Sequence, residues 1–299
     1  MLMATAETGD ERQDTARMAG NAARNRQRLL ELFGGLDDIT WGRRIGHDRR
    51  WAIQHLLAHL VNEEERMAAW IGDPAHADTP EKGGVYRRAL IAPFRPKALR
   101  APEDAEVDRL RLTPVPVLLE RYAALSATRV ALMQQCRDGK REEGDDAGQG
   151  MERGLEAMWL DQTLHEADLR RAIRARPLVK LVEDAEAHDL IGTAVRLLPE
   201  LFRSEGRAGQ GVRIYVGCTG PGRGLWQTQL GGEGKARRAD EEGRAAELRL
   251  DCSFATAIEV LTGERSLGRA VLSGAVRVSG RRPIRACLRL WRLRRGGGA

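Results

Sequence analysis

Apolar residues recur at helical spacing along the first two thirds of the chain, separated by polar and charged residues. In the segment from Trp51 to Ile71, they lie three or four positions apart and leave the acidic run Glu63–Glu65 mostly to one flank. The same pattern predicts amphipathic helices over residues 15–33, 51–71, from Pro114 or Pro116 to 136, 151–175 and 184–204. Four long helices are typical of a bundle, and the last segment either closes this first half of the chain or bridges to the second.

The pattern changes after about Gly209, where short β-type runs alternate with Gly-rich or charged turns. It predicts strands over 211–217, 224–230, 246–252 and 274–280, a helix over 254–264, and a terminal helix. Prolines across 72–112 predict a long irregular excursion, and the polar stretch 138–150 predicts a linker between helices. We therefore expect the α plus α+β class, a helical bundle followed by a smaller α+β domain.

Composition narrows the class of protein. The 299 residues are 42% hydrophobic and 31% charged, which suits a globular chain of two domains. No run approaches the ~18 apolar residues of a membrane helix, and the polar start lacks the apolar middle of a signal peptide. We therefore expect a cytoplasmic protein.

The net charge of +6 arises mostly from arginines spread along the whole chain, as is typical of a GC-rich genome. The one dense basic segment, residues 281–299, suits an amphipathic helix with a solvated arginine face better than a nucleic-acid or membrane patch. We therefore expect no nucleic-acid partner and no membrane partner.

Several common sites are not indicated. The four cysteines are isolated, which favours ordinary reduced thiols over a disulfide framework or a thiolate zinc cluster. The stretch GCTGPGRG (217–224) follows a predicted strand, but a second strand pattern comes after it, so we expect a hairpin turn and not a phosphate loop. GxSxG, Walker and HExxH motifs do not occur in the sequence.

The helix predicted over 151–175 breaks its own apolar stripe. Asp161 and His165 are spaced i, i+4; His165 falls between Met158 and Leu169 in the stripe that should be apolar, with Asp161 beside it. Polar residues in such positions are costly unless they are paired or ligated. This indicates a functional site, with a buried Asp–His hydrogen bond or a helix rotated toward water as the alternatives.

Two histidines on the helix predicted over 51–71 could complete that site. His59 sits at the edge of the apolar stripe, whereas His55 points further toward the polar side. Two imidazoles and one carboxylate from two helices would leave open coordination positions, as catalytic zinc sites do. His47, His76 and His188 show no ligand spacing and are expected to be surface or capping residues.

Three segments together resemble a known family. LLAHLVNEEE (56–65), preceded by Trp51, looks like the helix of DinB-like bundles that supplies a first histidine ligand. WLDQTLHEADLRRAI (159–173) looks like the carboxylate–histidine helix of mycothiol-dependent maleylpyruvate isomerases, and the segment from GVRIYVG to GAVRVSGR is similar to the sterol-carrier-like domain that this family appends. The resemblance implies a DinB-like metal-binding bundle over 1–180 and a sterol-carrier-like domain over 181–299.

Carried onto this sequence, the family's metal ligands would be His59, Asp161 and His165. The family usually has glutamate at the position of Asp161, so the shorter carboxylate would have to approach the ion more closely or bind it differently. The resemblance implies Zn²⁺ or another divalent metal, and mycothiol as the thiol cosubstrate. Because mycothiol is made by actinobacteria, an actinobacterial source is expected as well.

The implied function is that of a thiol-dependent enzyme. A thiolate formed at the metal would attack a small-molecule electrophile, and the outcome would be isomerisation or S-transfer. The protein would act as a monomer or homodimer, and no substrate-binding arginine can be assigned. The alternative is a metal-free protein that binds a lipid or another small molecule in the sterol-carrier-like domain, with His59 pointing away from an Asp–His pair.

Overall fold

The computed structural model describes residues 9–45, 51–72, 107–137, 146–203, 212–230, 237–238, 248–262 and 264–281. Within them the chain forms two compact units, one up to Ala175 and one from Arg176 onward. The first is helical and the second is α+β, which confirms the predicted fold class. The predicted assignment of 1–180 and 181–299 to DinB-like and sterol-carrier-like domains stays a prediction.

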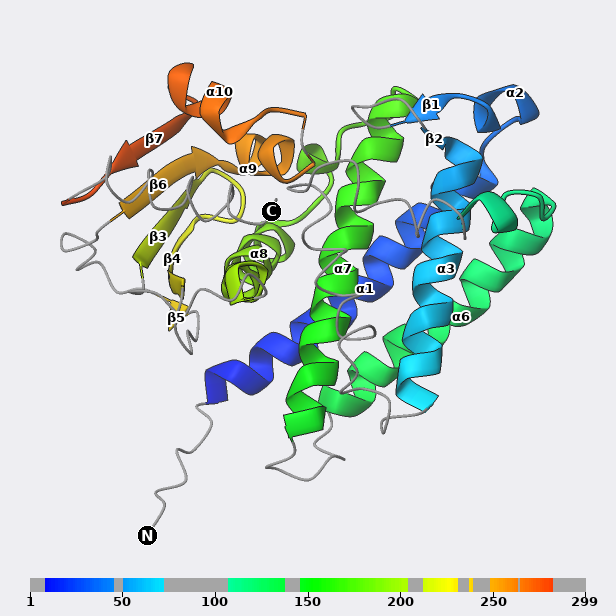
Figure 1. Cartoon of the computed structure of the whole chain (residues 1–299), viewed down its shortest axis with the longest axis horizontal. Helices are drawn as coiled ribbons and strands as arrows, with labels where there is room; N and C mark the ends of the chain where they lie inside the picture. Colours follow the sequence, from blue (N-terminus) through cyan, green and yellow to red (C-terminus); the bar gives the residue numbers. More distant parts are fainter. Residues whose placement is uncertain are drawn as a thin grey trace, which may run out of the picture. The chain divides into compact units, whose positions relative to one another are not determined.

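Four long helices form the first unit and run side by side (Figure 1). They are α1 (Gly9–Gly34), α3 (Ile53–Gly72), α6 (Val115–Arg137) and α7 (Asp146–Ala172). α6 packs against α1 and α3, and α7 contacts all three of the other helices. The short helix α2 (Asp38–Trp41) and the two-stranded antiparallel ladder of β1 (Arg44–Ile45) and β2 (Trp51–Ala52) connect α1 to α3.

The apolar stripes predicted from the sequence form the core of this bundle. Phe33 stacks on Trp41, with ring centroids 5.6 Å apart, and meets Tyr122 edge to face. On α3 the apolar positions of the predicted stripe that the structure describes are buried: Ile53, Leu56, Leu57, Leu60, Val61 and Met67. The core therefore fixes which face of α3 looks inward.

The element boundaries differ from prediction in three places in this unit. α1 begins at Gly9, before the predicted start at residue 15, and α7 begins at Asp146, inside the predicted linker. Trp51 and Ala52 are a strand and not the first turn of a helix, because they pair with β1. Most of the predicted excursion over 72–112, with His76, lies outside the described residues, as does His47.

The second unit contains a five-stranded sheet in the order β5-β4-β3-β6-β7 (Figure 1). Its strands are β3 (Val212–Thr219), β4 (Gly224–Leu230), β5 (Arg237–Arg238), β6 (Leu248–Ser253) and β7 (Val276–Ser279). β3 and β6 are parallel, with Cys218 opposite Cys252, and the other pairs are antiparallel. Ile214 and Leu248 form the buried centre of its apolar face.

The helices of this unit are α8 (Asp184–Arg203), α9 (Phe254–Leu261) and α10 (Leu267–Leu272), preceded by the 3₁₀ turn η4 (Leu178–Lys180). α8 packs against β4, so the helix predicted over 184–204 belongs to the α+β unit. α10 was not predicted; it begins at an N-cap, where the Ser266 side chain accepts a hydrogen bond from the Arg269 backbone amide. The predicted terminal helix lies outside the described residues.

The stretch 217–224 ends β3 and begins β4, as the predicted hairpin turn requires. Gly222 has a φ of +72°, and a Cβ there would lie 2.6 Å from the backbone carbon of Ala187 on α8. Only glycine avoids both the left-handed strain and that clash. Gly222 therefore allows the turn to pack closely against α8.

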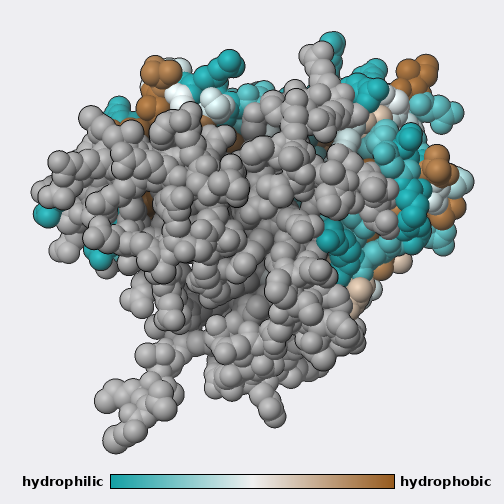
Figure 2. Space-filling model, in the orientation of Figure 1, coloured by the Kyte–Doolittle hydropathy of each residue, from teal (hydrophilic) through white to brown (hydrophobic). Residues whose placement is uncertain are grey.

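The coloured part of the visible surface is hydrophilic over much of its area, with separate hydrophobic spots (Figure 2). The most exposed large apolar residues among those described are Leu272, Ile39 and Leu112. They lie on α10, on α2 and just before α6. Single exposed apolar side chains of this kind are ordinary in globular proteins.

Candidate metal centre

Helix α3 carries the first candidate ligand inward. His59 lies on the buried face with only 7% of its surface exposed, between apolar neighbours that pack into the bundle core. The ring of Trp51, from β2, packs against the His59 ring with centroids 5.0 Å apart. The unpredicted strand at Trp51 therefore restricts the orientation of the imidazole.

Helix α7 carries the other two ligands, one turn apart. The His165 Nε2 atom lies 3.4 Å from the Asp161 Oδ2 atom, and the His59 Nε2 atom lies 3.9 Å from that same oxygen. The two imidazole rings meet nearly edge to face, with centroids 5.0 Å apart. One ligand atom from each of the three residues lies within 4.8 Å of the others. The structure thus brings together the residues that the sequence singled out.

The site is mostly shielded from solvent. The side chains of His59, Asp161 and His165 are 8%, 12% and 21% exposed. Burial on its own would raise the pKa of Asp161, but the charge of His165 and the hydrogen bond and charge of His59 outweigh it. The pKa of Asp161 is therefore held below its ordinary value, and the carboxylate stays ionised.

These residues fit a small divalent cation. Ligands about 2.1 Å from one ion in tetrahedral geometry lie about 3.4 Å apart, and their separation cannot exceed about 4.2 Å. The 3.4 Å between Asp161 and His165 matches the tetrahedral separation, and the 3.9 Å between Asp161 and His59 lies between that value and the maximum; the overall limit of 4.8 Å calls for a small closing movement. The aspartate reaches both imidazoles although it is one methylene shorter than glutamate.

The remaining described histidines do not join this cluster. His55 accepts a hydrogen bond through Nδ1 from the Ala52 backbone amide at 3.2 Å, near the start of α3. Burial and the charge of Arg111 lower the pKa of His55. His188, on α8, packs on the ring of Trp226 and bonds to the Arg223 carbonyl, which is a structural contact within the second unit.

The acidic run on α3 is buried more deeply than predicted. Glu63 and Glu64 are 4% and 1% exposed, and only Glu65 remains partly exposed. Glu64 pairs with Arg129 of α6. Periodicity alone predicts a flank position for charged residues. It does not show that Arg129, from a helix far away in the chain, pairs with Glu64 inside the bundle.

The comparison with known proteins identifies the class of chain that carries this bundle. Residues 22–170 match the family model of the mycothiol maleylpyruvate isomerase N-terminal domain, a span that includes α3, α6, half of α1 and almost all of α7. The chain therefore belongs to the mycothiol-dependent maleylpyruvate isomerase family. A search of curated proteins finds no significant match.

Solved structures show weaker similarity. Two are of the mycothiol-dependent maleylpyruvate isomerase, one of them a histidine-to-alanine mutant; each is 14% identical over 89% of this chain and 92% of that chain, with a TM-score of 0.46. The apo form of sterol carrier protein 2 from Yarrowia lipolytica is 14% identical over 34% of this chain and 91% of that chain, with a TM-score of 0.27. Among the described helices, none is both long enough and apolar enough to span a membrane.

Proposed function

We propose that this chain is an enzyme that holds a divalent metal, zinc by preference, on His59, Asp161 and His165. It would use a low-molecular-weight thiol, mycothiol by the name of its family, to isomerise a small electrophile or to transfer the thiol onto it. The observation that carries the proposal is the convergence of these three side chains in the bundle of a family named for this chemistry.

The donor set suits this role. A divalent cation held by two neutral imidazoles and one carboxylate keeps net positive charge and would favour the deprotonated form of a thiol that enters an open coordination position. His59 and His165 would each offer Nε2, and ionised Asp161 would offer Oδ2. Trp51 would hold the His59 ring against rotation, because its own ring packs on one side of the imidazole.

The metal-free alternative rests on aspartate standing at position 161 where the family usually has glutamate. It predicts that His59 points away from the Asp–His pair, whereas the His59 Nε2 atom lies 3.9 Å from Asp161 Oδ2. A cytoplasmic setting, a monomeric or homodimeric state and the lack of a nucleic-acid partner stay predictions.

An activity assay tests the proposal and separates the two reactions. The zinc-loaded protein would be incubated with mycothiol and a panel of electrophiles that includes maleylpyruvate, and both product and free thiol would be measured. Isomerisation returns the thiol, whereas S-transfer consumes one thiol for each product. Activity should require both metal and thiol, and should disappear in His165→Ala but persist in His55→Ala. Equal turnover by wild type and His165→Ala would refute the proposal.

A further inference from the structure

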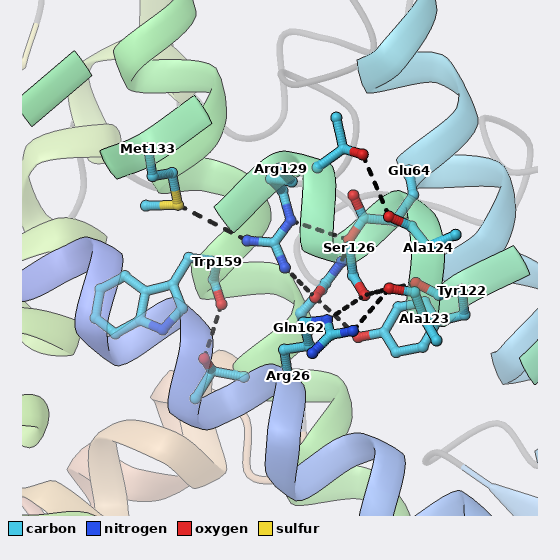
Figure 3. Close-up of polar contacts among 12 residues, drawn as sticks. Arg26, Glu64, Tyr122, Ala123, Ala124, Ser126, Arg129, Met133, Trp159 and Gln162 are labelled. Atoms are coloured by element: carbon cyan, nitrogen blue, oxygen red, sulfur yellow. Dashed lines mark hydrogen bonds and ion pairs between the residues drawn. The ribbon is translucent and has the colours of Figure 1, made fainter. Parts of the chain in front are cut away.

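A buried polar network connects α3, α6 and α7 inside the bundle (Figure 3). The Arg129 Nε atom donates to Glu64 Oε1 at 2.9 Å, and both side chains are only 1% exposed. Gln162, itself 1% exposed, connects the two. Burying such groups is costly unless their hydrogen bonds are made, so the network constrains the helices that carry it.

Gln162 is the centre of this network. Its Nε2 atom donates to Glu64 Oε1 at 2.7 Å, while its Oε1 atom accepts from Arg129 at 2.7 Å and from the Tyr122 hydroxyl at 3.1 Å. Burial and the charge of Glu64 raise the pKa of Tyr122, so that its hydroxyl keeps the proton it donates. One residue of α7 is thus bonded to α3 through Glu64 and to α6 through Arg129 and Tyr122.

The network residues are close in sequence to the candidate ligands. Gln162 directly follows Asp161 on α7, and Glu64 lies five residues after His59 on α3. A second anchor repeats the pattern one turn later, because Glu166 directly follows His165 and accepts hydrogen bonds from Asn25 and Arg28 of α1. Asp161 and His165 form the candidate metal centre. Gln162 and Glu166, each one position later and with the same i, i+4 spacing, are buried and bond to the neighbouring helices.

The geometry of a helix shows why such anchors matter. Side-chain tips lie about 6 Å from the helix axis, so a rotation of α7 by about 20° would move them by about 2 Å. Metal–ligand distances tolerate only about 0.2 Å. The position of Asp161 and His165 opposite His59 thus depends on what fixes the rotation of α7.

We propose that Gln162 is a positioning residue of the metal centre, which acts together with Glu64 and Arg129. By bonding α7 to α3 and α6, it sets the rotation of α7 that brings Asp161 and His165 to His59. The inference rests on the proposed function, because it assumes that these three side chains bind a metal. It assigns Gln162 no contact with the metal or the substrate.

Two variants test this role. Gln162→Met keeps the approximate shape of the side chain and removes its hydrogen bonds. Ser126→Ala is the matched control, because the Ser126 hydroxyl bonds Arg26 of α1 and the Tyr122 carbonyl, and bonds none of the described side chains of α3 or α7.

Zinc affinity would be measured by competition with a chromophoric chelator, and ligand geometry by the visible absorption of the Co²⁺-loaded proteins. Gln162→Met should bind zinc about 10–100-fold more weakly, which is the loss of affinity typical when a residue that orients metal ligands is removed. It should also change the Co²⁺ spectrum. Ser126→Ala should leave both properties unchanged. A role in stability alone would lower the free energy of unfolding without moving affinity or spectrum.

The outcomes separate the two proposals. A wild-type protein that binds neither Zn²⁺ nor Co²⁺ overturns the proposed function and this inference with it. A wild type that binds, beside a Gln162→Met protein of equal affinity and spectrum, overturns the inference alone. If Gln162→Met does not fold, Tyr122→Phe removes a single bond to Gln162: a weaker zinc affinity supports the inference, and an unchanged one overturns it.

Discussion

Replacement of Arg129 by methionine should destabilise the bundle strongly. The guanidinium group is 1% exposed and bonds Glu64 at 2.9 Å and Gln162 at 2.7 Å. Its loss leaves the Glu64 carboxylate buried, with Gln162 as the remaining hydrogen-bond partner among the described residues. Removing one partner of a buried ion pair costs about 3–5 kcal/mol, because the other charge is left uncompensated.

The double variant Arg129→Met with Glu64→Met distinguishes a stranded charge from lost packing. It removes both charges and leaves only the Gln162 amide short of partners, which costs about 1–3 kcal/mol. The double variant should therefore be more stable than the single one. A purely steric account predicts the opposite order, since two substitutions disturb the packing more than one.

Urea denaturation followed by far-UV circular dichroism measures the difference. With a slope of about 2 kcal/mol per molar urea, the loss in Arg129→Met corresponds to a midpoint lower by about 1.5–2.5 M. A shift of under about 0.5 M, or a double variant less stable than Arg129→Met, would refute the reasoning.

Three further predictions concern the turn, the thiols and the carboxylate. Gly220→Ala should cost about 1–2 kcal/mol from the left-handed backbone alone, and Gly222→Ala more, because its Cβ also meets the backbone of α8; equal thermal shifts would contradict this. Burial raises the pKa of Cys218 to about 12, so mass mapping should find it unalkylated in the native protein, and rapid labelling would argue against that burial. In metal-free protein, the stability advantage of wild type over Asp161→Asn should be fully present above the ordinary aspartate pKa of 3.8 and should fade as pH falls through the lower native pKa; denaturation midpoints that differ equally at all pH values would count against it.

The candidate ligands were predictable because they violate a local rule. Asp161 and His165 interrupt an apolar stripe at a spacing that places them on one face, and helical projection separates His59 from His55. These are properties of single helices and need no knowledge of the tertiary structure. That α3 and α7 pack so that the three side chains meet depends on the whole bundle, and for that the sequence offered a family resemblance.

The buried network escaped prediction for a physical reason. An acidic run and an arginine on separate helices are typical of solvated faces, and the sequence does not show that Arg129 reaches Glu64 from α6. A signal was nevertheless present. Gln162 and Glu166 repeat the i, i+4 spacing one position after Asp161 and His165. Two further polar residues therefore lie in a part of α7 that is mostly buried.

Element boundaries failed where pairing or capping decides the structure. Trp51 lies in a strand because β1 provides its hydrogen-bonding partner. The helical pattern of apolar residues includes Trp51 and does not indicate this pairing. α10 has only six residues and depends on its Ser266 cap, so its apolar pattern is too short for a periodic signal. The longer helices, whose patterns extend over several turns, were predicted in the right places, although α1 and α7 begin several residues earlier than predicted.

The most direct test of the account is the metal content of the purified protein. Wild type, His165→Ala and His55→Ala would be purified without chelator and analysed by mass spectrometry for bound zinc and other divalent metals. The account predicts about one ion per chain in wild type and in His55→Ala, and a near-complete loss in His165→Ala. Equal metal content in all three proteins would contradict the proposed centre.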